Sequence, residues 1–194
     1  MITKEVLLDL YVAKRMSVKA IADRLGYSRR GVKYWMDKHE IKTRSLSDAV
    51  YTWHHPNGDP FAFIPPKTKE EHQLFGLGLG LYWGEGTKAN KGSVRLGNTD
   101  PEMIKVFMNF LIKFFSLERS DFRFGLQIFS DITEKDALDF WAKKLKISRS
   151  QFYKTMITPS GSVGTYRKKS KYGVLTIYYN NTKVRDMLVS FLPA

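Results

Sequence analysis

The side chains best suited to binding a partner gather in one short segment near the N-terminus. They are Ser28, Arg29, Arg30, Lys33 and Tyr34. Helical spacing places all of them on the solvent face of a helix predicted over residues 29–39. Guanidinium, ammonium and hydroxyl groups of this kind reach base edges and phosphates in nucleic-acid complexes. The segment therefore predicts a surface that contacts nucleic acid.

Lys42 and Arg44 follow this helix and are expected to track a phosphate backbone. Two earlier helices must hold the basic helix in place. Ser17 is expected to cap the second helix, Gly26 to end it in a tight turn, and Ser28 to cap the third. The apolar positions recur at helical spacing and should form the core: Val6, Leu7, Leu10, Tyr11, Ile21, Ala22, Leu25, Val32, Trp35 and Met36.

Residues 1–46 resemble the helix-turn-helix family. Small Ala22 lies where two helices cross, Gly26 follows four residues later in the turn, and apolar Val32 and Trp35 follow at the family's spacing. The resemblance implies that the third helix enters the major groove of double-stranded DNA. The alternative is a small three-helix packing module whose basic face is merely solvated.

The composition supports a polyanionic partner. Among 194 residues, 32 lysines and arginines against 19 acidic residues give a net charge of +13. Charge alone does not separate DNA from RNA or from an anionic membrane. With no cysteine, disulfides and thiolate metal sites are excluded. The N-terminus is unlike a signal peptide, and no apolar run is long enough to span a bilayer, so we expect a cytoplasmic or nucleoid-associated protein without a membrane partner.

Residues 47–68 are rich in turn-forming residues and are predicted to link two domains. Phe61, Phe63 and Ile64 are expected to anchor this linker on the second domain. His54 and His55 raise the idea of a metal site, but no third ligand follows at a suitable spacing. We therefore interpret them as part of a solvated loop.

The second domain, residues 69–194, opens with the glycine-rich stretch EHQLFGLGLGLYWGEGTK. Gly76, Gly80 and Gly84 recur every four residues and form one stripe along a helix, here called the glycine stripe. Each glycine costs a helix about 1 kcal/mol relative to alanine, so the stripe needs a compensating contact, and close approach of a second helix supplies one. A phosphate-binding glycine loop is the competing interpretation, but no Lys-Ser/Thr follows at the required spacing.

This stretch resembles the LAGLIDADG homing-endonuclease family. The family's nine-residue motif corresponds to Gly78–Gly86, GLGLYWGEG, in which Gly80, Leu81 and the closing Gly86 match. Glu85 takes the place of the motif's final acidic residue. Trp83 departs from the family, which often has Asp there.

The elements expected after the motif extend the resemblance over residues 70–192. They are a β-hairpin at 87–98, an apolar helix through Phe115, an alternating strand near 121–130, a helix at 134–145, two further strands and a closing helix. The family fold implies an α+β chain: a trihelical helix-turn-helix followed by an αββα-type saddle whose curved antiparallel sheet lies in the major groove. The helix at 134–145 departs from the simplest family members.

A single motif is present, and single-motif members of the family pair through their motif helices. The resemblance therefore implies a homodimer with Gly76, Gly80 and Gly84 in its interface and two Glu85 carboxylates near its axis. Glu85 would be the ligand of Mg²⁺ (or Mn²⁺), and no small-molecule cofactor is expected. The alternative role for Glu85 is a helix-end carboxylate that makes a local hydrogen bond.

Basic and polar side chains should assist at the phosphate. Lys171 or Lys169 would supply the electrophilic help, and Gln127 would position water or contact DNA. Further DNA contacts are expected from Arg95, Arg123, Arg167 and Lys168. Equally, residues 167–171 could form a loop that makes only non-specific phosphate contacts.

Three functions are consistent with these residues. The first is a site-specific, metal-dependent DNA endonuclease of LAGLIDADG type that acts as a homodimer. The second is a DNA-binding transcriptional regulator that has the same scaffold but does not cleave. The third is a resolvase-type enzyme that acts on branched DNA.

Overall fold

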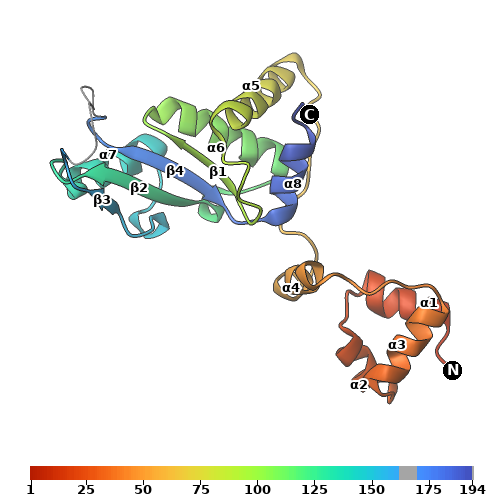
Figure 1. Cartoon of the computed structure of the whole chain (residues 1–194). Coiled ribbons are helices and arrows are strands. Elements are labelled where there is room, and N and C mark those ends of the chain that lie inside the picture. The colour runs from red at the N-terminus through yellow and green to blue at the C-terminus, as the bar shows by residue number, and fades with distance from the viewer. Residues whose placement is uncertain (162–169, 194) are drawn as a thin grey trace. The chain divides into compact units, whose positions relative to one another are not determined.

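The chain divides into two compact units, unit 1 from Met1 to Pro60 and unit 2 from Phe61 to Ala194 (Figure 1). The structure is a computed structural model that describes residues 1–161 and 170–193. The division falls inside residues 47–68, which were expected to form a linker. Part of that segment is instead a helix, α4 (Leu46–His54), which belongs to unit 1 and is capped by Ser45.

Three helical segments form the core of unit 1. The first is α1 (Lys4–Leu7), which continues as the π-helical segment η1 (Leu8–Ala13). The others are α2 (Val18–Leu25) and α3 (Arg29–Lys38). The predicted caps are confirmed: Ser17 and Ser28 accept hydrogen bonds from the first turns of α2 and α3, and Gly26 ends α2 with a φ of 68°. The core comprises Ile2, Leu7, Leu10, Tyr11, Ile21, Ala22, Val32, Met36 and Ile41.

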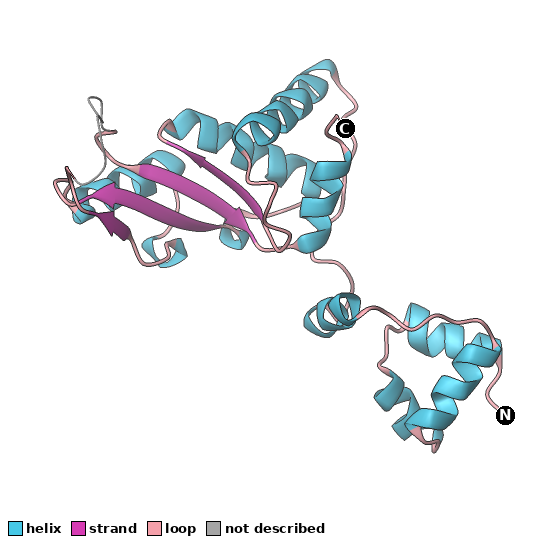
Figure 2. Ribbon diagram, viewed as in Figure 1, coloured by secondary structure: helices cyan, strands magenta, loops and turns pink. Residues whose placement is uncertain are grey.

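Unit 2 is an α+β unit built around a four-stranded sheet (Figure 2). Its elements, in chain order, are α5 (Lys69–Glu85), β1 (Val94–Asn98), α6 (Pro101–Phe115), η2 (Arg119–Asp121), β2 (Arg123–Phe129), α7 (Glu134–Leu145), η3 (Arg149–Gln151), β3 (Met156–Thr158), β4 (Val174–Tyr179) and α8 (Thr182–Ser190). The strand order is β1-β4-β2-β3. The expected helix at 134–145 is confirmed as α7.

The sheet is mixed, whereas an antiparallel sheet was expected. β4 pairs antiparallel with both β1 and β2, but β3 runs parallel to β2. The reason is the connection: α7 and η3 carry the chain back to the end of the sheet at which β2 began, as a parallel crossover requires. β3 then forms a three-residue edge strand.

The hairpin expected at 87–98 is reduced to β1 and one bridge between Gly86 and Leu96. Local and long-range bonds replace the missing ladder. The Asn90 side chain accepts from the Gly92 N–H and from the Ser93 hydroxyl, which closes a side-chain turn. The Lys88 carbonyl accepts from Arg185 of α8 and not from a neighbouring strand.

One face of the sheet carries the core of unit 2. Alternate strand residues point into an aromatic cluster with α6, including Phe107, Phe110 and Phe114. The other strand residues are exposed or half-buried, so the second face of the sheet is open.

Helix α5 is fastened to α6 at its N-terminus. Thr68 and Glu71 form a reciprocal capping box, and the Glu71 carboxylate lies 2.8 Å from Lys113 Nζ. The hydrogen bond from Lys113, followed by that from the Lys67 N–H, lowers the pKa of Glu71 to about 2. Because the folded-state pKa is depressed, this contact stabilises the fold above pH 4.5 and is lost as the pH falls towards 2.

Packing of α5 on α6 depends on a different glycine from the glycine stripe. A Cβ atom at Gly78 would lie far inside the van der Waals radius of the Phe110 ring, so the bare backbone of α5 rests directly on that ring. Phe75 and Tyr82 flank this contact, on Phe114 and Phe107 respectively. A Cβ atom at Gly76, Gly80 or Gly84 would meet nothing within 4 Å.

Alanine substitutions within α5 should therefore have opposite effects two residues apart. Gly78→Ala should lower the free energy of unfolding by about 1–3 kcal/mol, because its methyl group forces the Phe110 ring to move. Gly80→Ala, the matched control in open space, should raise it by about 0.5–1 kcal/mol through helix propensity. Urea unfolding of dilute, monomeric protein measures both. Equal effects would contradict the assigned packing.

Candidate nucleic-acid interface

The solvent face of α3 presents the basic side chains expected there. Arg29, Arg30, Lys33 and Tyr34 are exposed, while Val32 and Met36 are fully buried on the opposite side of the helix. Within residues 1–161 and 170–193, the three cationic groups form no hydrogen bond or ion pair. Ser28 is already engaged, because its Oγ accepts from the Gly31 N–H at 3.0 Å. The face is thus a free basic surface on a rigid helix.

Arg44 does not join this surface. Its guanidinium donates to the carbonyls of Tyr11, Arg15 and Met16, and it stacks over the Tyr11 ring at 4.1 Å. These carbonyls lie at and beyond the end of the first helix, where backbone partners run out. Arg44 therefore fastens the helices of unit 1 together, in contrast to the backbone-tracking role expected for it. Lys42 remains exposed.

Two arginines of unit 1 should respond differently to the same substitution. Arg44→Gln should lower the free energy of unfolding by about 1–3 kcal/mol, because partly buried carbonyls lose charged donors. Arg29→Gln, on the exposed face of α3, should change it by less than about 0.5 kcal/mol. Urea titration followed by circular dichroism compares them. A stable Arg44→Gln protein would show that Arg44 is free for another role.

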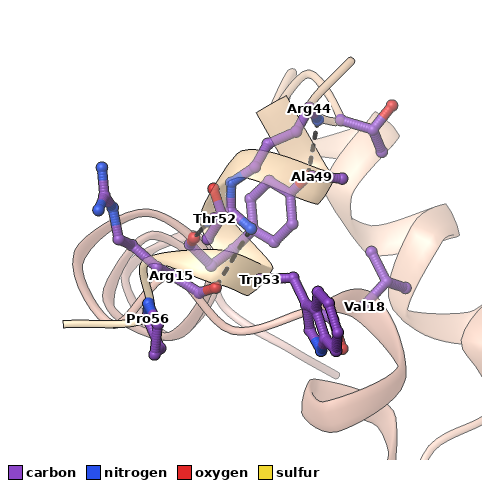
Figure 3. Close-up of a pocket in the computed structure, with 10 residues that line it drawn as sticks. Arg15, Val18, Arg44, Ala49, Thr52, Trp53 and Pro56 are labelled. Atoms are coloured by element: carbon purple, nitrogen blue, oxygen red, sulfur yellow. Dashed lines mark hydrogen bonds between the residues drawn. The ribbon is translucent and has the colours of Figure 1, made fainter. Parts of the chain in front are cut away.

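Unit 1 also contains a pocket of about 390 Å³ that sequence reasoning missed (Figure 3). Arg15, Arg44 and Trp53 are among its lining residues. Arg15 donates to the His55 carbonyl at 3.4 Å and lies 3.3 Å from an Asp59 carboxylate oxygen, which ties the end of α4 to the helices before it. The Trp53 indole is 77% exposed, so the pocket is open on that side. The pocket was not predicted from the sequence, because nearly all residues of α4 were assigned to the linker.

The open face of the sheet in unit 2 carries a row of basic and aromatic side chains. Arg95 of β1 and Arg123 of β2 both pair in register with Tyr178 of the central strand β4. The Arg95 guanidinium lies 5.2 Å from the centre of the Tyr178 ring. Arg123 donates through Nη1 to the carbonyls of Ser120 and Phe122. We call these three residues the arginine row.

The neighbouring row is flat and uncharged. Gly97 and Gly125 flank Thr176, and a Cβ atom at either glycine would come within 3.0 Å of the Thr176 hydroxyl or the Tyr178 ring. None of the four strands contains an acidic residue. The open face thus carries positive charge and has no protruding side chain at Gly97 and Gly125. It can accept a polyanion without repulsion.

Glu85 is close to the arginine row, because the two residues that follow it pair with β1 next to Arg95. It is the exposed last residue of α5, and Gly86 next to it bridges to Leu96 of β1. The Thr87 N–H then donates to the Arg95 carbonyl at 2.9 Å. The Glu85 carboxylate stands at the C-terminal, negative end of the α5 macrodipole, where a cation is favoured. The Lys88 ammonium places one positive charge at this helix end, because it donates a hydrogen bond to the Trp83 carbonyl at 2.5 Å.

Lys171 and Gln127 lie towards the other end of the sheet. Gln127 pairs with Val174, the first residue of β4, and Lys171 precedes that residue. The row that contains Leu96 crosses β4 at Ile177, roughly 10 Å further along the strand at about 3.3 Å per residue. Glu85 is therefore brought towards Arg95 and not towards Lys171. Arg167, Lys168 and Lys169 lie outside the described residues.

In the part of the chain that the structure describes, no three His, Cys, Asp or Glu side chains cluster, and His54 and His55 gain no third ligand. Glu85 is an exposed carboxylate, a group that Mg²⁺ accepts as one ligand among several. In the same described part, no helix is long and apolar enough to cross a membrane.

The glycine stripe is open along α5. Its three glycines are exposed, and Leu77 and Trp83 border it on either side with 53% and 58% of their surface accessible. At roughly 100° per residue, Glu85 is turned away from the stripe towards the side of Gly78 and Tyr82. Among the residues that the structure describes, no atom outside α5 packs on the glycines of the stripe.

Comparison with known proteins adds no relative. No family model, no curated protein and no solved structure matches the chain.

Proposed function

We propose that the chain is a double-stranded DNA endonuclease of LAGLIDADG type that acts as a homodimer and carries an N-terminal helix-turn-helix. One observation carries the proposal: an acid-free, arginine-bearing open sheet face adjoins a carboxylate at the end of a helix with an open glycine stripe. Each of these features has a use in cutting DNA.

The sheet face of unit 2 suits the groove and backbone of a duplex. The arginine row supplies two cations across three strands, and Gly97 and Gly125 keep the surface beside it low. β-structure can enter the major groove, and arginines at its surface reach both phosphates and guanine edges. Binding should weaken steeply with salt, since each neutralised phosphate releases counterions.

Unit 1 supplies a second contact in this proposal. A helix that is capped by Ser28, packed through Val32 and Met36, and basic on its free face has the form of a recognition helix. Arg29, Arg30 and Lys33 lack partners in the described part of the chain, so their donors are available to DNA. Unit 1 would lengthen the bound site and not define its centre.

A second copy of the chain would cover the glycine stripe. Bare backbone at Gly76, Gly80 and Gly84 lets another helix approach closely, and Leu77 and Trp83 would be buried at the edges of the contact. A two-fold axis along the contact would make the two α5 helices parallel and bring the ends that carry Glu85 near each other, with each carboxylate on the side of its helix away from the stripe. Two carboxylates and two helix C-termini then create a strongly negative site that favours divalent cations.

Glu85 from each copy, with phosphate oxygens and waters, would hold Mg²⁺ (or Mn²⁺). When bound, the ion supplies an activated water and offsets charge on the phosphate. The other residues of the chain position the strand. Arg95 is the better candidate for phosphate contact near Glu85, because Lys171 belongs to the opposite end of the sheet.

A non-cleaving regulator is the second candidate. The observation that favours it is the small number of candidate groups: no three His, Cys, Asp or Glu side chains cluster among the described residues, and the nearby Lys88 ammonium already donates to the Trp83 carbonyl. The same sheet and α3 would then bind DNA without chemistry.

Cleavage of a randomised duplex library in Mg²⁺ or Mn²⁺ distinguishes the two functions. Wild-type protein should cut, and Glu85→Gln should lose at least about 100-fold in rate while it keeps its DNA affinity. Glu102→Gln removes an exposed carboxylate from α6 and is the matched control, which should cut normally. If wild type and Glu85→Gln both bind the library and neither cuts, the regulator is correct.

The dimer is tested separately by Gly80→Leu. The leucine side chain would stand in the middle of the glycine stripe and should convert the dimer to monomer in sedimentation equilibrium. Lys143→Leu adds the same side chain to an exposed position of α7 and should leave the dimer intact. An unchanged dimer in Gly80→Leu would refute pairing through this stripe.

A further inference from the structure

The chain that leaves Glu85 is held by a residue far away in the sequence. Arg185, in the first turns of α8, donates through Nη2 to the Lys88 carbonyl and lies 2.8 Å through Nη1 from the Asp186 carboxylate. Its side chain is only 13% exposed. A charged group this buried is costly unless it is paired and hydrogen-bonded, and the Asp186 carboxylate and the Lys88 carbonyl provide these partners.

Arg185 also lies against the last turn of α5. Tyr82, one helical turn before Glu85, is fully buried, and its ring stacks on Phe107. Burial raises the pKa of Tyr82, while the neighbouring positive charge of Arg185 acts in the opposite direction. The Tyr82 hydroxyl and Arg185 Nε are both buried without a hydrogen bond of standard geometry among the described residues, and the Arg185 and Tyr82 side chains interact with each other at this junction.

Gly86 makes the junction tight. A Cβ atom there would overlap both the ring and the carbonyl oxygen of Tyr82, so the chain turns directly over that residue. The turn delivers Thr87 to β1 and the Lys88 carbonyl to Arg185. Glu85 is therefore held between a packed helical turn and a connection fixed at two points, one of which is Arg185.

We propose that Arg185 is a positioning residue for Glu85, which acts by locking the connection between α5 and β1. The proposal rests on the proposed function for its effect on catalysis. Arg185 itself is too buried to contact DNA. Its role is to hold the Lys88 carbonyl, so that the end of α5, and with it the carboxylate, keeps one direction.

Amide hydrogen exchange tests the lock without reference to activity. In Arg185→Met, which removes the donors but keeps an apolar stem, peptides covering residues 82–90 should exchange about tenfold faster or more, with the rest of unit 2 unchanged. Arg185→Lys keeps one cationic donor and should restore part of the protection. Arg149→Met breaks a surface pair with Asp139 and is the matched control, which should leave residues 82–90 unaffected.

Kinetics then test the consequence for Glu85. Arg185→Met should lose about 10–100-fold in cleavage rate and need more Mg²⁺ for half-maximal rate, with DNA affinity unchanged and partial rescue in Arg185→Lys. Unchanged exchange at residues 82–90 in the folded variants overturns the lock. Faster exchange with unchanged kinetics overturns the positioning role. If wild-type protein does not cut DNA but residues 82–90 still exchange faster in Arg185→Met, the lock is supported and only the proposed nuclease activity is rejected. If Arg185→Met does not fold, exchange in Arg185→Lys decides.

Discussion

The contact between Gly78 and the Phe110 ring is the constraint on which unit 2 depends. It seats the bare backbone of α5 directly on the Phe110 ring of α6, and it fixes the rotation of α5 about its own axis. With Gly78 inward, Tyr82 must stack on Phe107 and the glycine stripe must face outward. The direction of Glu85 follows from the same rotation. A single missing side chain thus decides which surface of α5 is core and which is free.

Arginine serves two purposes in this chain. Arg44, Arg119, Arg123 and Arg185 each donate to backbone carbonyls at places where the chain leaves a helix or enters a strand. The planar group with several donors satisfies orphaned carbonyls that lysine would reach singly. The positive charge of the protein is therefore partly structural, and the cations free to meet a phosphate are fewer than the composition indicates. Those on α3 are the clearest free set.

Local signals predicted much of the fold, and contacts between distant segments decided the rest. As expected, α2 and α3 begin after Ser17 and Ser28, and α2 ends at Gly26, because a cap acts within one turn. The parallel direction of β3 depends on how α7 returns the chain, and no pattern within residues 156–158 encodes it. Arg44 looked like another phosphate-binding residue, since the carbonyls that engage it are about thirty residues away. For the same reason the candidate site was only partly predicted: Glu85 and Arg95 were each named from the sequence, whereas their nearness in the sheet and the contact of Arg185 with Lys88 required the fold.

The link between Arg185 and Lys88 spans 97 residues. A ribosome delivers the N-terminal end of a chain first, and compact helical units fold as they emerge. Unit 1 can therefore fold before α8 is synthesised, while the connection after α5 still lacks its contact with Arg185. Until that last helix is made and packed, the segment around Glu85 lacks its fastening. The order of synthesis would then separate two events in time: the basic face of α3 forms early, and the Glu85 carboxylate of unit 2 acquires a fixed direction only at the end.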